Sequence, residues 1–166
     1  MKTVRSSWFA LACAAFLSAT SAALEIGERA PSFALPTAGG DTVRLEGLRG
    51  KAVYVDFWAS WCGPCRQSFP WMNEMQRRYG NQGLSIVAVN VDRKRDDATR
   101  FLSEVPADFT VVYDAPGATP AAYAVKAMPS SYLIDRGGNI VAIEQGFRDE
   151  SRSALEQRIR ALVAPR

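Results

Sequence analysis

The chain contains no histidine, which is the commonest general base and the commonest metal ligand in proteins. A serine or cysteine triad that depends on an imidazole is therefore excluded. Cysteine is scarce as well, with three residues at positions 13, 62 and 65. Any chemistry must come from thiols and carboxylates.

Long apolar runs are also lacking. The run 8–17 is shorter than the about 20 residues of a membrane-spanning helix. It follows Lys2 and Arg5 and precedes the small residues 18–23, which is the layout of a secretory signal peptide. We expect a cleaved signal, periplasmic localisation and no stable membrane insertion; the alternative is an uncleaved anchor that leaves the domain facing the periplasm.

Cys13 lies inside the expected signal peptide, residues 1–23, and would be removed with it. The mature chain, residues 24–166, is long enough for one compact domain. It would keep two cysteines, in a compartment where disulfides form and persist. Because residues 1–23 hold two basic and no acidic residues, the formal charge of +3 becomes +1, which indicates neither nucleic acid nor anionic lipid as a partner.

The pattern of apolar residues predicts an α/β fold. The nearly continuous apolar run 52–58 predicts a strand covered on both faces, with Asp56 as its one charged residue. A helix to Tyr79, kinked at Pro70, leads to a second apolar strand, 84–91. The order strand, helix, strand implies a parallel crossover.

The remaining elements extend this sheet. Thr119 as a cap and Pro120 at the first helical position predict a brief helix at 121–125. Further helices are expected at 96–102 and 150–163, and further strands at 31–36, 42–45, 110–113, 130–134 and 140–145. Glycine-rich turns join the first and the last pair of these strands as hairpins, so the sheet is mixed.

Cys62 and Cys65 follow the first buried strand and open a helix. Unpaired amides and the dipole at a helix N-terminus favour a thiolate, so Cys62 is the predicted nucleophile. Cys65, three residues on, is placed to resolve a mixed disulfide. A structural disulfide would add little over so short a loop, and a zinc site needs more ligands, so no metal or other cofactor is expected.

Residues 58–65 read Trp-Ala-Ser-Trp-Cys-Gly-Pro-Cys and resemble the thioredoxin active-site segment. Over about residues 30–163 the chain is similar to the exported TlpA/ResA branch of the thioredoxin superfamily. That resemblance implies a thioredoxin-like fold, with a central mixed sheet flanked by helices, an N-terminal hairpin and a βα insertion at 93–128. Partner choice is expected in the insertion and the hairpin.

The resemblance also carries residue roles. Pro129 is expected to follow a cis bond beside the disulfide and to leave the Met128 backbone free to pair with an extended substrate. Substrate contacts are further expected at Trp61, Gly63 and Pro64. Trp58 and Pro70 are expected to support the site.

Asp56 matches the buried acid of thioredoxin, and desolvation should raise its pKa so that it takes the proton of Cys65. A structural carboxylate is the alternative, and Ala88 stands where thioredoxin commonly has a lysine. Many members of the exported branch carry asparagine at the Asp56 position, so this site is more thioredoxin-like than its surroundings. The charged run 93–97 is interpreted as solvated surface.

These observations predict an exported thiol-disulfide oxidoreductase that reduces protein disulfides. The resemblance implies apocytochrome c or copper-site cysteines as its clients. The Gly63-Pro64 pair resembles the reducing type, for which the family implies a membrane electron donor of the DsbD or CcdA type. A thiol peroxidase is one alternative, although the peroxiredoxin motif is missing before Cys62. A Sco-type copper chaperone is another, but its histidine ligand is absent.

Overall fold

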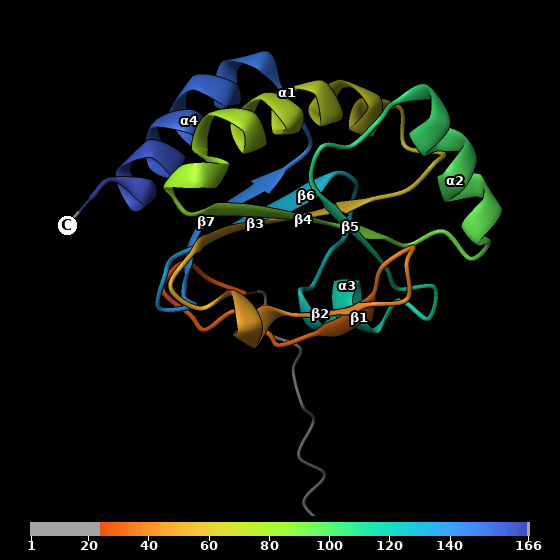
Figure 1. Ribbon diagram of the computed structural model, residues 1–166, viewed down its shortest axis with the longest axis horizontal. Helices are drawn as coiled ribbons and strands as arrows, with labels where there is room; N and C mark the ends of the chain where they lie inside the picture. Colours follow the sequence, from red (N-terminus) through yellow and green to blue (C-terminus); the bar gives the residue numbers. More distant parts are fainter. Residues whose placement is uncertain (1–23, 166) are drawn as a thin grey trace, which may run out of the picture.

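The computed structural model describes residues 24–165, and the signal peptide expected at residues 1–23 lies outside them. A five-stranded sheet forms the centre of the molecule, in the order β5-β4-β3-β6-β7 (Figure 1). Its strands are β3 (Ala52–Trp58), β4 (Leu84–Asn90), β5 (Thr110–Tyr113), β6 (Ser130–Ile134) and β7 (Ile140–Gln145). All five match the strands predicted from the sequence to within one residue.

The sheet is mixed, as predicted. Strand β4 runs parallel to both β3 and β5, whereas β6 is antiparallel to β3 and β7 is antiparallel to β6. The connection from β3 to β4 passes through α1 (Gly63–Tyr79) and forms the expected parallel crossover. Because β3, β4 and β5 are parallel, the loops that follow them meet at one edge of the sheet.

Helices and a hairpin cover opposite faces of the sheet. Figure 1 shows the helices α1, α2 (Arg95–Glu104) and α4 (Asp149–Val163) on one face. The other face carries a two-stranded antiparallel sheet and a short helix: β1 (Ala34–Pro36), β2 (Thr42–Arg44) and α3 (Ala118–Ala122). Two 3-10 helices follow β2 and α1: η1 (Leu45–Leu48) and η2 (Gly80–Gln82).

Strand β3 is buried along its whole length because both of its faces are covered. Tyr54 and Trp58 belong to the core beneath the helices, whereas Val55 and Phe57 belong to the core beneath the hairpin. Side chains alternate between the two faces of a strand. Asp56 therefore faces the helical side, which is also the side of the two cysteines.

The helices on this face follow the sequence pattern closely. Helix α1 runs without interruption through Pro70, and the kink expected there stays a prediction. Helices α2 and α4 each begin one residue before the predicted start, and α2 continues two residues further. No helix within residues 24–165 is long and apolar enough to cross a bilayer.

The helix predicted at 121–125 is wrong in position. Helix α3 spans Ala118–Ala122, and Thr119, the predicted cap, is buried inside it. The carboxylate of Asp114 accepts the backbone N–H groups of Thr119 and Gly117, at 2.6 and 3.1 Å. An acid five residues upstream therefore satisfies the helix start, and the left-handed backbone of Ala124, with φ of +52°, prevents the helix from continuing.

The N-terminal hairpin is fastened to the far edge of the sheet. Its first strand is shorter than predicted, and Thr37, just after it, forms a bridge with Val112 of β5. The guanidinium of Arg95 donates a hydrogen bond to the Thr37 carbonyl at 3.0 Å. The hairpin thus lies against the loop after β4 and the end of β5.

Candidate active site

Cys62 and Cys65 are joined by a disulfide at the start of α1. Cys62 is the cap residue of this helix, and its Sγ accepts a hydrogen bond from the Cys65 backbone N–H at 3.3 Å. Helix N-termini favour negative charge because their first amides lack partners and the dipole is positive there. The geometry therefore stabilises a thiolate on Cys62 once the bond is reduced.

The two sulfurs differ in access to solvent. Cys62 keeps 4% of its surface exposed, whereas Cys65 keeps none. A disulfide that approaches from outside therefore meets Cys62 first. The roles predicted for the two cysteines follow this order of access and stay predictions.

Asp56 lies in the middle of β3 and is 1% exposed. It is paired in the sheet with Ala88 of β4 on one side and Ser131 of β6 on the other. Its Oδ2 has no hydrogen-bond partner within the described residues. Burial raises the pKa of this carboxyl well above its ordinary value, in the predicted direction. Its role as the base for Cys65 stays a prediction.

The bond between Met128 and Pro129 is cis, as the resemblance implied. Pro129 is buried, and its carbonyl accepts the backbone N–H of Gly146 at 2.8 Å. Met128 is half-buried and packs against the core that contains both cysteines. The structure thus places this segment on the side of the disulfide, and substrate pairing at Met128 stays a prediction.

The two tryptophans of the motif occupy different environments. Trp58 is fully buried, with its ring centroid 4.9 Å from that of Phe69 and 4.7 Å from that of Phe101. Trp61 is 70% exposed, which is unusual for so large an apolar side chain. Trp58 therefore packs the core behind the disulfide, and Trp61 offers an exposed aromatic surface beside it.

The residues between the cysteines are placed differently from one another. Pro64 is the second residue of α1, where its missing N–H leaves no helical hydrogen bond unmade. Gly63 opens the helix, and a Cβ added there would have no atom within 4 Å. Packing therefore does not require glycine at position 63.

Sequence reasoning missed two polar contacts near the site. Ser60, in the loop before Cys62, donates its backbone N–H and its hydroxyl to the Asp92 carboxylate. The Tyr54 hydroxyl donates to Ser131 Oγ at 2.7 Å, and burial, followed by the charge of Asp56, raises the Tyr54 pKa. The Ser60 to Asp92 contact could have been expected from the position of Asp92 just after β4. The parallel strands β3 and β4 end at the same edge of the sheet, so the residues that follow them lie close together.

No group of three or more cysteine, aspartate or glutamate side chains within residues 24–165 is arranged to hold a metal ion. The two sulfur atoms of the site belong to Cys62 and Cys65. A dithiol and a disulfide differ by two electrons and two protons, and their exchange with another disulfide uses no additional group.

Comparison with known families decides the assignment. The Redoxin family profile matches residues 25–159. The chain belongs to the Redoxin family. The thiol-disulfide oxidoreductase ResA of Bacillus subtilis is 35% identical over 125 residues, which cover 75% of this chain and 70% of that protein. ResA of Bacillus thuringiensis subsp. konkukian is 30% identical over 140 residues, which cover 84% and 80% of the two chains.

A solved structure has a similar fold. A structure from Chlorobium tepidum, assigned to a thiol:disulfide interchange protein DsbE, is 54% identical, with a TM-score of 0.83. It covers 86% of this chain and 100% of its own. These comparisons confirm the thioredoxin-like fold and the resemblance to the ResA group. This Redoxin family member is a thiol-disulfide oxidoreductase, and its cysteines need no cofactor.

Proposed function

We propose that this chain is an exported protein-disulfide reductase in which Cys62 is the nucleophile and Cys65 the resolving thiol. The observation that carries the proposal is the unequal placement of the two sulfurs. Cys62 caps α1 and is the more exposed, whereas Cys65 is enclosed behind it. The unpaired amides at the helix start favour negative charge on the group that must attack first.

The proposed reaction moves two electrons from the enzyme to the client. The Cys62 thiolate attacks a client disulfide, so that a bond forms from Cys62 to one client sulfur and the other leaves as a thiolate, which takes up a proton. Cys65 then loses its proton and attacks Cys62 Sγ. This step forms the intramolecular disulfide and releases the second client thiolate.

We assign Asp56 as the group that accepts the Cys65 proton. A carboxyl whose pKa is raised by burial is a better base near neutral pH than an exposed one. Both residues lie on the helical side of β3. Ala88, which is paired with Asp56 in the sheet, carries no charge. Burial is therefore the cause of the raised Asp56 pKa.

The client is proposed to bind in an extended form next to the disulfide. The Met128 backbone would pair with it as an added strand, a mode that accepts many sequences. Trp61 supplies exposed aromatic surface, and the open space at Gly63 beside the exposed Pro64 allows close approach of a second chain. Generic backbone pairing suits an enzyme that acts on proteins.

The proposed direction is reduction. Thioredoxin, at about −270 mV, and DsbA, at about −120 mV, share this architecture and differ by roughly 7 kcal/mol in disulfide stability. The Gly63-Pro64 pair resembles the former. Outside the cytosol such a reductase needs electrons from across the membrane, so we propose a donor of the DsbD or CcdA type and a client such as an apocytochrome c in cytochrome maturation.

Export to the periplasm is part of this proposal and rests on the sequence of residues 1–23. Basic residues, a short apolar run and small residues follow one another there. A fusion of these residues to a reporter enzyme that is active only outside the cytosol tests it. Reporter activity with cleavage near Ala23 is expected, and activity confined to the cytosol would refute export.

The reaction is tested with two cysteine variants of the mature chain. Cys62→Ser should abolish insulin reduction, because the nucleophile is lost. Cys65→Ser should accumulate mixed disulfides with the client, because the intermediate can no longer be resolved. Loss of activity in both variants without any trapped adduct would contradict the assigned roles, and peroxide turnover by Cys65→Ser would favour a thiol peroxidase.

A separate measurement decides the direction. The equilibrium reduction potential of the mature protein can be titrated in defined thiol buffers, followed by tryptophan fluorescence and thiol counting. A value of about −250 mV or lower supports a reductase, whereas a value near −120 mV would make the protein an oxidant.

A further inference from the structure

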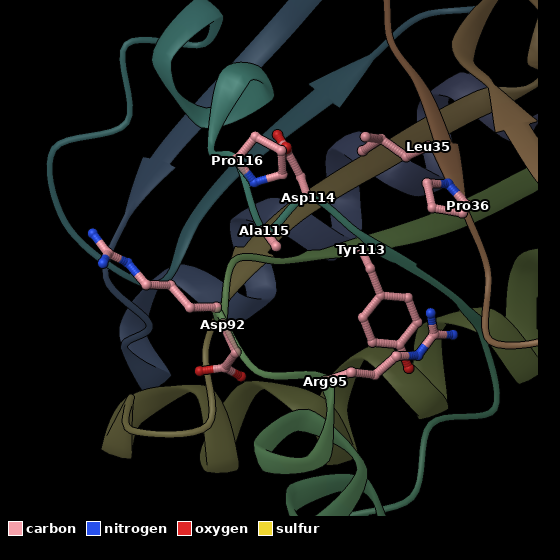
Figure 2. A pocket seen from close by; sticks show the side chains of 9 residues that line it. Leu35, Pro36, Asp92, Arg95, Tyr113, Asp114, Ala115 and Pro116 are labelled. Carbon is pink, nitrogen blue, oxygen red and sulfur yellow. The ribbon is translucent and has the colours of Figure 1, made fainter.

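A cavity of about 410 Å³ lies beside the active-site loop, at the carboxyl ends of β4 and β5 (Figure 2). Most of its wall is apolar and comes from β1, from the end of β5 and from the loop after β5. The apolar lining consists of Leu35, Pro36, Tyr113, Ala115 and Pro116. The hairpin and the insertion 93–128, which set this chain apart from simple thioredoxins, thus build the cavity together.

The cavity is connected to the disulfide through one contact. Asp92 lines the cavity and accepts two hydrogen bonds from Ser60, which lies two residues before Cys62. Two residues span at most about 7 Å, so the wall of the cavity lies within roughly 10–15 Å of Cys62. An extended peptide covers that distance in about three to five residues. One bound segment can therefore reach both places.

The exposed charge at the mouth of the cavity is positive. Arg93 and Arg95 line the cavity and are exposed, and Lys94, also exposed, lies between them in the chain; within residues 24–165 neither Arg93 nor Lys94 forms an ion pair. The Arg95 guanidinium lies 3.9 Å from the centroid of the Tyr113 ring, and Figure 2 shows the two side by side at one wall. This pair presents a flat aromatic wall with a cation against it.

The acidic residues nearby are either buried or lie at the start of α2. Asp92 and Asp114 are buried and accept hydrogen bonds, Asp92 from Ser60 and Asn90, and Asp114 from the start of α3. Asp96 and Asp97 lie in the first turn of α2, where the helix dipole favours them, and Asp97 is 3.5 Å from Arg100. An arriving carboxylate would thus meet unpaired cations at the mouth.

We propose that the cavity binds an apolar side chain of a client polypeptide, with an acidic residue of that segment held by Arg93. This inference rests on the proposed function, because it requires a polypeptide disulfide as the substrate. The apolar walls remove the side chain from water, and the basic mouth selects its neighbour. The charged run that the sequence suggested to be plain solvated surface becomes a selecting element.

The test uses peptides with one cysteine, each activated as a mixed disulfide with 2-thiopyridine. One peptide carries a Leu-Glu pair three to five residues from the cysteine, and two others carry Leu-Lys or Gly-Glu there. The reduced protein should release 2-thiopyridine from the Leu-Glu peptide about tenfold faster than from either other peptide. Ala115→Trp, which fills the cavity, and Arg93→Glu should each remove most of that preference.

Two matched variants on α4 serve as controls, since Ala161 and Arg160 are exposed there, outside the cavity. Ala161→Trp and Arg160→Glu should keep the full preference. Reduction of hydroxyethyl disulfide should be unchanged in all four variants, and if the wild-type protein fails on this small substrate the proposed function itself is wrong. The cavity proposal is overturned if the wild-type protein reduces hydroxyethyl disulfide but shows no preference for the Leu-Glu peptide. It is also overturned if that preference survives Arg93→Glu. Both results can be obtained even if Ala115→Trp fails to fold.

Discussion

The Asp92 carboxylate accepts two hydrogen bonds from Ser60, one from the backbone N–H at 2.9 Å and one from the hydroxyl at 3.0 Å. The side chain of Asn90 donates a third, at 2.8 Å. An acid after β4 thereby fixes the loop that delivers Cys62 from β3 to α1. The position of Cys62 therefore depends on Asp92, which lies in the loop after the neighbouring strand β4.

Asp92→Asn should destabilise the protein by about 1–3 kcal/mol, because an amide cannot accept from all three donors and leaves buried groups unpaired. Ser60→Ala should cost about 1 kcal/mol, since it removes the hydroxyl bond alone. Urea unfolding of the two single variants and the double variant measures the coupling between them. Strictly additive losses would mean that the Ser60 hydroxyl and the Asp92 carboxylate are not coupled.

Asp56→Asn should change the pH dependence of stability. Since burial raises the folded pKa of Asp56, its stabilising contribution is complete below the unfolded pKa, near 4, and is lost as pH rises through the folded pKa. Between the unfolded and the folded pKa of Asp56, the free energy of unfolding of the wild-type protein should fall by about 1.4 kcal/mol per pH unit relative to Asp56→Asn. Urea unfolding of the oxidised forms between pH 4 and 9 measures the difference.

A second carboxylate provides a control of opposite sign. Burial raises the pKa of Asp135, but hydrogen bonds from Asn139, Gly138 and Gly137 outweigh it and leave the pKa lowered. The contribution of Asp135 is therefore present above its unfolded pKa and lost as pH falls through the folded one. Asp135→Asn should be the less stable protein at neutral pH, and a difference for Asp56→Asn that does not vary with pH would contradict its raised pKa.

The tryptophans of the motif should separate stability from turnover. Trp58→Ala should cost about 3–5 kcal/mol, because it empties a site packed between Phe69 and Phe101. Trp61→Ala should change stability by less than about 0.5 kcal/mol, because the side chain is exposed, while lowering kcat/KM for a protein substrate. Thermal unfolding and insulin reduction measure the two effects. Equal losses of stability would refute this division.

Local pattern alone predicted the five strands of the sheet and the placement of the disulfide. The apolar run of β3 predicts a strand with both faces covered, and the motif after it predicts Cys62 at a helix start. The cis bond before Pro129 came from family resemblance, since sequence spacing does not distinguish cis from trans. These features depend on residues that are close in sequence.

Contacts between distant residues escaped the prediction. Helix α3 was shifted because Asp114, outside the expected capping position, binds its first amides. The Ser60 to Asp92 contact joins residues 32 positions apart and needs the parallel pairing of β3 and β4 to be known first. A side-chain oxygen accepts hydrogen bonds from whichever donors lie near it in the folded structure. The sequence pattern alone does not indicate which loops lie next to each other.

Gly63 offers the last prediction, because the space beside it is open. Gly63→Lys should place a cation next to the Cys62 thiolate, stabilise the reduced form and raise the reduction potential by about 10–20 mV, the equivalent of roughly 0.5–1 kcal/mol. Gly63→Glu should lower the potential by a similar amount, and Gly63→Ala, which adds no charge, is the control. Titration in defined thiol buffers at low and high salt measures the shifts. Since screening weakens exposed charge pairs, both shifts should shrink at high salt, and shifts of the same sign for lysine and glutamate would show that side-chain volume, rather than charge, sets the potential at this position.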